Sequence, residues 1–192
     1  MISVKDDEIC FAKIRPNATI PTKRVEDAGY DMWACFDEDY FVIAPGKTRG
    51  IPTGIAAAFS DKYYIQIEER SSMVKFNAKK SAGVFDSGYR GEYFIMTYNI
   101  GDKPFVISKI EYDDMPKKFV VGGKTYKKDK VTVFPYKKAV CQAVVLIVPK
   151  LKTKELSYDE LLSIPSERKT GGFGSSDEAK WKKEEKKKKA SK

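Results

Sequence analysis

Short runs of strand-forming residues recur along most of the chain, and they limit its fold more than any other feature. The runs are separated by turn residues such as Pro45-Gly46, Ser87-Gly88 and Gly122-Gly123, of which the last predicts a two-residue hairpin turn. The apolar run 144–148 is typical of a strand that is buried on both faces. Many short strands at this spacing predict an all-β sandwich or jelly roll. The runs expected to form strands are residues 8–14, 39–44, 63–68, 92–99, 105–112, 118–121, 124–127, 131–134 and 140–148.

One short helix is predicted near the C-terminus, over residues 157–162. Ser157 precedes the helical residues as an N-cap, and Glu160, three positions later, completes a capping box. Leu156 and Leu161 are spaced to pack together as a hydrophobic staple across the first turn. We therefore expect an all-β chain that carries a single helix.

The sequence contains no histidine, and this narrows the chemistry available to it. A Ser-His-Asp or Cys-His nucleophile, an imidazole general base and a histidine-bearing zinc site are all excluded. Cys10, Cys35 and Cys141 are odd in number and far apart, so we expect buried free thiols in a reducing compartment and no disulfide framework. Any catalysis must use carboxylates, hydroxyls, amides, Lys, Arg or a bound metal ion.

The formal net charge of +9 is concentrated in two parts of the chain. Residues 103–138 hold 10 Lys and 4 acidic residues, residues 177–192 hold 8 Lys and 4 acidic residues, and the rest of the chain has a net charge of −1. The tail 177–192 has too little apolar surface to fold, so we expect it to be disordered, with weak and salt-sensitive affinity for polyanions. The basic segment 103–138 is a candidate contact for a protein partner.

No segment predicts membrane insertion or export. The longest apolar run, residues 143–148, has six residues, whereas a membrane-spanning helix needs about 20. Residues 1–11 carry charges where a signal peptide needs an apolar core. The sequence therefore predicts a soluble, intracellular protein with no membrane contact, cytoplasmic, with a nuclear location left open for a eukaryotic host.

Five short motifs occur in order, at residues 27–34, 70–73, 83–92, 140–144 and 168–176. They read DAGYDMWA, RSSM, GVFDSGYRGE, VCQAV and RKTGGFGSS. Together they resemble the five motifs of the homotrimeric dUTPases, the deoxyuridine 5′-triphosphate nucleotidohydrolases. The resemblance implies a jelly-roll-like dUTPase fold with a flexible C-terminal arm, a homotrimer with shared active sites, and hydrolysis of dUTP to dUMP and pyrophosphate with Mg²⁺. The segment 103–138 is similar to an extra segment of some phage members.

The third motif supplies the candidate catalytic residue. Judged alone, Asp86 before Ser-Gly indicates a turn as readily as it indicates a catalytic residue. An ionised carboxylate is also a weak base, which deprotonates water effectively only when the water is well placed and the electrophile is activated. The resemblance implies that Asp86 deprotonates the water that attacks the α-phosphorus of dUTP. It also implies that Tyr89, otherwise a hairpin packing residue, packs against the deoxyribose. A hairpin over residues 77–85 is implied to read uracil through its backbone.

The second and fourth motifs supply candidate phosphate ligands. Taken alone, Arg70 at a strand end is more often a surface ion-pair partner, and Gln142 in an apolar strand more often satisfies backbone groups. The resemblance implies that Ser71 donates to phosphate oxygens and that Arg70 and Gln142 order the site. Ser72 stands in place of the usual Gly of this motif, and its backbone N–H is still implied to donate to phosphate. Asp31 of the first motif is implied to reach Mg²⁺ through water, which suits a cation that keeps several waters.

Residues 168–176 combine Gly, Ser, Arg and Phe in a pattern that suits a flexible linker or a phosphate-binding loop. The expected organisation is a β-rich domain over residues 1–165, a nucleotide-closing arm over 166–176 and the Lys-rich tail over 177–192. The resemblance implies substrate contacts from Arg168 to the γ-phosphate, from Phe173 to uracil, and from Gly174, Ser175 and Ser176 to the phosphates.

Two alternatives to a dUTP hydrolase remain at this stage. A regulatory or binding protein of the same fold could act through the basic segment 103–138, with hydrolysis secondary. A dCTP deaminase shares the fold, but it needs a catalytic Glu in the strand after the third motif, where this chain has Met96. The deaminase would therefore lack its proton shuttle.

Overall fold

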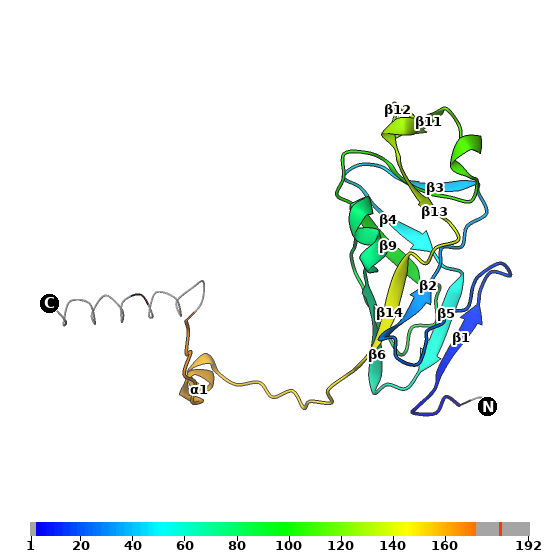
Figure 1. Cartoon of the computed structure of the whole chain (residues 1–192). Helices are drawn as coiled ribbons and strands as arrows, with labels where there is room; N and C mark the ends of the chain where they lie inside the picture. The colour runs from blue at the N-terminus through cyan, green and yellow to red at the C-terminus, as the bar shows by residue number, and fades with distance from the viewer. Residues whose placement is uncertain (1–2, 172–180, 182–192) are drawn as a thin grey trace. The chain divides into compact units, whose positions relative to one another are not determined.

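A computed structural model describes residues 3–171 and residue 181 of the chain. The chain divides into two units, residues 1–150 and 151–192. In the described residues, the first unit is built of β-strands and short 3₁₀ turns, and the second contains α1, Tyr158–Ser163 (Figure 1). The prediction of an all-β fold is confirmed, as is the prediction of a short helix that begins after Ser157.

The sheet that matters most for function has the strand order β2-β14-β6-β8 and is antiparallel throughout. Figure 1 shows β14 running beside β2 and β6, in the middle of the β unit. The prediction that residues 144–148 are buried on both faces is wrong, because Leu146 and Ile147 are exposed and the other three residues are only partly buried. The four strands are β2 (Gly29–Met32), β6 (Tyr63–Glu68), β8 (Val84–Asp86) and β14 (Cys141–Ile147).

The other strands form four smaller sheets. Two of them are the pair of β1 (Ile9–Lys13) with β5 (Ile55–Phe59) and the ordered set of β4 (Thr48–Pro52), β9 (Phe94–Asn99) and β7 (Ala78–Lys80). The third orders β13 (Thr132–Pro135), β10 (Phe105–Ser108) and β3 (Tyr40–Ile43), and the last is the hairpin of β11 (Lys118–Val121) and β12 (Lys124–Lys127). The 3₁₀ turns are η1 (Ser71–Phe76), η2 (Tyr112–Asp114) and η3 (Lys128–Lys130).

A single main core joins these sheets and is dominated by large buried side chains. Phe105 and Phe134 pack with their ring centroids 6.1 Å apart, and both are fully buried. Strand β10 is buried at all four positions because both of its faces are covered: Phe105 and Ile107 pack in the main core, and Val106 packs in a second, smaller core. Each such side chain stabilises the fold by about 1.5–3 kcal/mol through burial. The core therefore ties sequence segments from residue 32 to residue 143 into one body.

The basic segment 103–138 begins and ends inside this body. Its flanking strands β10 and β13 pair with each other in parallel and contribute side chains to the main core, whereas the hairpin β11–β12 projects beyond them at one end of the β unit (Figure 1). Gly122 and Gly123 both have positive φ, 58° and 77°, as a tight hairpin turn of the predicted type requires. A small separate core of Val106, Met115, Phe119 and Val131 holds the hairpin. Whether this segment is an insertion stays a prediction.

Five strands lie outside the runs that the sequence pattern predicts: β2, β4, β5, β7 and β8. Strand β4 contains Gly50 and ends at Pro52, residues that disfavour strands. Strand β5 has three consecutive alanines, which favour helix. Pairing with β9 and β1 overrides these local preferences, because the tertiary contacts bury Ile51, Ile55 and Phe59.

The three cysteines are free, as predicted, but only two of them are buried. Cys35 and Cys141 lie in the interior, whereas the prediction of burial is wrong for Cys10. Cys10 lies on β1, which pairs with β5 alone among the strands that the structure describes, and alternation along β1 turns the Cys10 side chain outward. Among the described residues no helix combines the length and the apolar character needed to cross a membrane.

Candidate active site

Three strands place polar residues in one row across the main sheet. Gln142 on β14 lies directly opposite Asp31 on β2 and directly opposite Glu68 on β6. Directly opposite residues of antiparallel strands project from the same face, so the side chains of Asp31 and Gln142 are neighbours. Gln142 Nε2 donates a hydrogen bond to the carbonyl oxygen of Glu69, 3.2 Å away, which fixes the amide at the end of β6.

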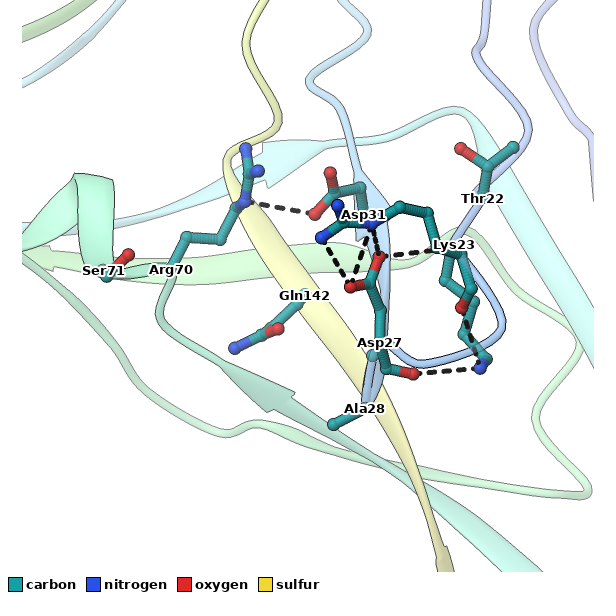
Figure 2. Close-up of a pocket in the computed structure, with 10 residues that line it drawn as sticks. Thr22, Lys23, Asp27, Ala28, Asp31, Arg70, Ser71 and Gln142 are labelled. Atoms are coloured by element: carbon teal, nitrogen blue, oxygen red, sulfur yellow. Dashed lines mark hydrogen bonds and ion pairs between the residues drawn. The ribbon is translucent and has the colours of Figure 1, made fainter.

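Arg70 and Ser71 extend this row where β6 ends and η1 begins. Arg70 Nε lies 3.1 Å from Asp31 Oδ1, and a second guanidinium nitrogen donates to the carbonyl oxygen of Ala139 at 3.4 Å. Ser71 is the first residue of η1 and is exposed, as is Ser72. Figure 2 shows Arg70 and Asp31 facing each other beside the strand that carries Gln142. Residues from the first, second and fourth motifs are thus brought together.

These residues line an open cleft of about 700 Å³. Its walls are mostly polar and carry charges of both signs; Arg70 lies on one side of Asp31, and the loop between β1 and β2, with Lys23 and Asp27, lies on the other side of Asp31 (Figure 2). A cleft of this volume and polarity suits a charged ligand of nucleotide size. The lining residues are Thr22, Lys23, Arg24, Asp27, Ala28, Gly29, Asp31, Arg70, Ser71 and Gln142.

Sequence reasoning missed three charged residues of this cleft, Lys23, Arg24 and Asp27. Arg24 forks onto Asp27, with Nη2–Oδ1 and Nε–Oδ2 distances of 2.8 and 3.0 Å, and the backbone N–H of Arg24 also donates to Oδ2 at 3.0 Å. These bonds lower the pKa of Asp27 to about 2. Lys23 Nζ donates to the carbonyl oxygen of Asp27 at 2.9 Å and so closes the loop. The position of Asp27 at the start of the first motif was the one available signal.

Partly and fully buried groups support the end of β6 next to Gln142. Glu69 accepts a hydrogen bond from the backbone N–H of Lys80 at 2.8 Å, and Lys80 Nζ donates to Thr97 Oγ1 at 3.3 Å. Burial lowers the pKa of Lys80 and raises the pKa of Cys141 to about 12. Cys141 is therefore a protonated packing residue next to Gln142.

The third motif lies elsewhere on the sheet. Asp86 is the last residue of β8 and lies opposite Tyr64 on β6, four residues before the Glu68 that faces Gln142. Four residues of a strand span about 13 Å, and β6 itself stands between the two strands. Asp86 does not line the cleft. A single subunit therefore does not bring Asp86 to Gln142.

The turn after β8 places Tyr89 beside Asp86. The backbone N–H of Tyr89 donates to the carbonyl oxygen of Asp86 at 3.1 Å, so the predicted turn at Asp86-Ser87-Gly88 is present. The expected hairpin over residues 77–85 is wrong, because β7 pairs with β9 and β8 pairs with β6 in a different sheet. Between these two strands the chain passes from one sheet to the other, through Ala82 with a positive φ of 51°.

Of the predicted C-terminal contacts, only Arg168 falls within the described residues. Its Nε donates to the carbonyl oxygen of Gly171 at 2.7 Å, which closes a turn in the second unit. Phe173, Gly174, Ser175 and Ser176 lie outside the described residues.

Comparison with known proteins identifies the family. The family model for dUTPase matches residues 16–111 of this chain. The chain belongs to the dUTPase family. The deoxyuridine 5′-triphosphate nucleotidohydrolase of Leptospira interrogans is 38% identical to this dUTPase over 104 residues, which cover 52% of this chain and 71% of the relative. The enzyme of the same name from Gloeobacter violaceus is 31% identical over 153 residues, which cover 78% and 82%.

The fold of this dUTPase also matches a solved structure. A variant of the Staphylococcus bacteriophage 80alpha dUTPase with dUpNHpp superposes with a TM-score of 0.66 at 20% identity, covering 88% of this chain and 98% of that chain. The prediction of a jelly-roll-like dUTPase fold is thereby confirmed, as is the prediction of a dUTPase-type nucleotide hydrolase.

The residues of the cleft suit a magnesium ion only when the ion binds together with a phosphate ligand. Within residues 3–171, no group of three or more acidic or Cys side chains could hold a metal ion. Two carboxylates line the cleft: Asp31, whose Oδ1 contacts Arg70, and Asp27, onto which Arg24 donates. A site with so few carboxylates fits Mg²⁺, which binds through one or two carboxylates together with waters and substrate phosphates.

Proposed function

We propose that this dUTPase hydrolyses dUTP to dUMP and pyrophosphate by water attack on the α-phosphorus, with Asp86 as the general base. The observation that carries the proposal is the convergence of Asp31, Arg70, Ser71 and Gln142 in one polar cleft. A triphosphate needs cationic and hydroxyl donors along its length. Arg70, Ser71 and the amide of Gln142 supply these groups at one edge of the sheet.

Each residue of the cleft has a distinct proposed role. Ser71 donates its hydroxyl to phosphate oxygens near the bond that breaks, and Ser72, which is also exposed, would offer its backbone N–H to the same group. Gln142, held by the carbonyl of Glu69, orients the phosphate and the attacking water. Arg70 braces the site through Asp31 and balances part of the phosphate charge.

Mg²⁺ is the proposed cofactor, and Asp31 would hold it through water. The ion would neutralise phosphate charge and make the α-phosphorus more electrophilic. Asp86 then needs only to hold and deprotonate the attacking water, a task that an ionised carboxylate can perform when the electrophile is activated. No histidine is needed for this chemistry.

The distance between Asp86 and the cleft supports a homotrimer with shared active sites. Within one subunit, β6 separates Asp86 from Gln142, so Asp86 would have to act on a nucleotide held in the cleft of a neighbouring subunit. Exposed apolar side chains at Val84, Leu146 and Ile147 on this sheet favour association with another protein surface. Closed symmetric assembly of identical subunits satisfies both features.

Two further proposals concern the substrate. Tyr89, beside Asp86, would pack against the deoxyribose and leave no room for a 2′-hydroxyl. Arg168 and the residues that follow it, through 176, would close over the triphosphate as an arm. The backbone of a Gly-rich segment suits this role because successive N–H groups can surround phosphate oxygens.

Pyrophosphate release with dUTP, dTTP, dCTP and CTP, measured in the presence and absence of Mg²⁺, tests the function. We expect strong preference for dUTP and loss of turnover when the metal is chelated. Similar rates with all four nucleotides would contradict the proposal. Unchanged turnover in a chelator would remove Mg²⁺ from it.

A further inference from the structure

The loop from Asp86 to Glu92 is fixed by hydrogen bonds on both sides of Tyr89. The turn is closed by the Tyr89 N–H on the Asp86 carbonyl, and the Arg90 guanidinium donates to the carbonyl oxygens of Tyr89 at 3.1 Å and Ala57 at 3.4 Å. The backbone around Tyr89 is therefore tied to β5 as well as to β8. Its side chain projects from a rigid frame.

The ring of Tyr89 folds back over this frame. Its hydroxyl donates to the carbonyl oxygen of Glu92 at 3.1 Å, and its ring lies parallel to the rings of Tyr93 and Phe85 at centroid distances of 5.9 and 6.2 Å. Tyr93 is fully buried and stacks on Phe85 at 4.0 Å. These contacts hold one position of the Tyr89 ring.

Glu92, whose carbonyl receives the Tyr89 hydroxyl, is itself anchored to the body of the subunit. Its Oε1 accepts a hydrogen bond from the backbone N–H of Gly54 at 2.8 Å and lies 3.5 Å from Arg15 Nε. The side chain of Glu92 is largely shielded from solvent, with 13% exposed. The acceptor that fixes the tip of the Tyr89 ring is thus held in place by residues far away in the sequence.

Gly91 provides the space that this ring position needs. A Cβ atom on Gly91 would lie 2.4 Å from Tyr89 Oη, 2.6 Å from Cζ and 3.0 Å from Cε2. A Cβ atom cannot lie this close to the ring, and Tyr89 is 44% exposed, so its side chain has room to move away; a side chain at position 91 would therefore displace the Tyr89 ring. Gly88, in the same loop, offers a matched comparison, because a Cβ atom there would meet nothing within 4 Å.

We propose that Gly91 is a specificity-determining positioning residue, which keeps the Tyr89 ring where it excludes a ribonucleotide. The inference rests on the proposed function, in which Tyr89 forms the wall against the deoxyribose. Tyr89 can exclude a 2′-hydroxyl only if its ring does not move away from the deoxyribose. The absence of a Cβ at position 91 lets the ring keep its hydrogen bond to Glu92 and its stacking on Tyr93, and both contacts prevent that movement.

The test compares kcat/KM for dUTP and for UTP in wild type, Gly91→Ala, Gly88→Ala, Tyr89→Ala and the double variant Tyr89→Ala with Gly91→Ala. We expect Gly91→Ala to lower the dUTP-to-UTP ratio about tenfold or more, and Gly88→Ala to preserve it. In the Tyr89→Ala background, Gly91→Ala should change the ratio by less than about twofold, because the ring that it displaces is gone.

Several outcomes would overturn the inference. If the wild type prefers dUTP and Gly91→Ala has the same dUTP-to-UTP ratio of kcat/KM, Gly91 does not have the proposed role and the proposed function still stands. If Gly91→Ala lowers the dUTP-to-UTP ratio equally with and without the Tyr89 ring, Gly91 acts through the backbone and not through Tyr89. A wild type without dUTP preference would defeat the proposed function and this inference together.

The melting temperature provides a second measurement, which tests the inference even if the Gly91→Ala variant is unstable. Removal of the Tyr89 ring relieves the contact, so the double variant should recover a melting temperature close to that of Tyr89→Ala. If the melting temperature of the double variant does not recover, the Tyr89 ring is not the group that occupies the space next to Gly91.

Discussion

Asp86 and Gln142 lie on the two strands that flank β6, opposite Tyr64 and Glu68 respectively, and are therefore four residues apart in its register. This separation is a property of the sheet and does not depend on side-chain rotamers. It means that the base proposed for catalysis and the amide proposed to orient the phosphate belong to different sites within one subunit.

Subunit mixing tests the shared site that follows from this separation. Asp86→Asn and Ser71→Ala variants should each be nearly inactive alone. If one site takes Asp86 and Ser71 from different subunits, random reassembly of an equal mixture should restore about a quarter of wild-type activity. The control mixes each variant with itself through the same unfolding and refolding cycle. No recovery in verified mixed trimers would place both residues in the same subunit's site.

Asp86→Asn tests the base directly. The amide has nearly the shape of the carboxylate but cannot accept the proton, so kcat should fall about 10²- to 10⁴-fold while binding of a non-hydrolysable dUTP analogue is preserved. Steady-state kinetics and calorimetry provide the two readouts. Asp113→Asn, an exposed carboxylate on η2, serves as the control and should leave both unchanged. Turnover near the wild-type rate in Asp86→Asn would exclude the proposed role.

Asp27 should titrate well below an ordinary aspartate. Because hydrogen bonds from Arg24 lower its pKa to about 2, its carboxylate stays ionised as the pH falls past 3.8. The folded-state pKa lies below the unfolded value, so the Arg24–Asp27 pair contributes stability above about pH 4 and loses it as the pH falls toward 2. NMR titration of the Asp27 carboxyl measures this directly. In Arg24→Gln the midpoint should rise toward the ordinary value, and an unchanged midpoint would contradict the assignment.

Thiol labelling should distinguish Cys10 from the other two cysteines. Cys10 is exposed, whereas burial raises the pKa of Cys35 and raises that of Cys141 to about 12. The thiolate is the reactive form, so at about pH 8 an aromatic disulfide reagent should modify one thiol in the native protein and three after unfolding. Cys10→Ser should abolish the fast native reaction. Rapid labelling that persists in this variant would show that an interior cysteine is accessible.

Phe119→Ala tests the small core under the basic hairpin. Phe119 is 3% exposed and packs edge-on against Tyr40 with ring centroids 5.2 Å apart. Its truncation should lower the local free energy of unfolding by about 3–5 kcal/mol, seen as faster amide exchange in β11 and β12. Val120→Ala on the same strand, where 76% of the residue is exposed, should have little effect. Equal exchange in the two variants would contradict a separate core at the hairpin.

Local patterns were sufficient for several elements of this fold. The capping box of α1 forms as predicted, with Ser157 Oγ accepting from the Glu160 N–H at 3.3 Å and the Glu160 carboxylate accepting from the Ser157 N–H at 2.8 Å. The Gly122-Gly123 turn likewise joins two strands within the predicted ranges. Both features depend on contacts between residues close in sequence, so the sequence alone determines them.

The candidate site shows the limit of such patterns. The motifs named Asp31, Arg70, Ser71 and Gln142, yet they gave no reason to include Lys23 and Arg24, which reach the cleft through an irregular loop. Strands such as β5 form because of long-range pairing that outweighs the helical preference of alanine. Residue types and their order could be read from the chain, but neighbours in space could not.

The sequence by itself determined the chemistry of this dUTPase: a site without histidine, five ordered motifs and an all-β chain with one capped helix. Only the tertiary structure decided that the first, second and fourth motifs meet while the third lies apart from them, because the register of β6 against β8 and β14 sets the positions of Asp86 and Gln142. Register follows from the burial of alternate side chains across a sheet, and that depends on partners distant in the sequence.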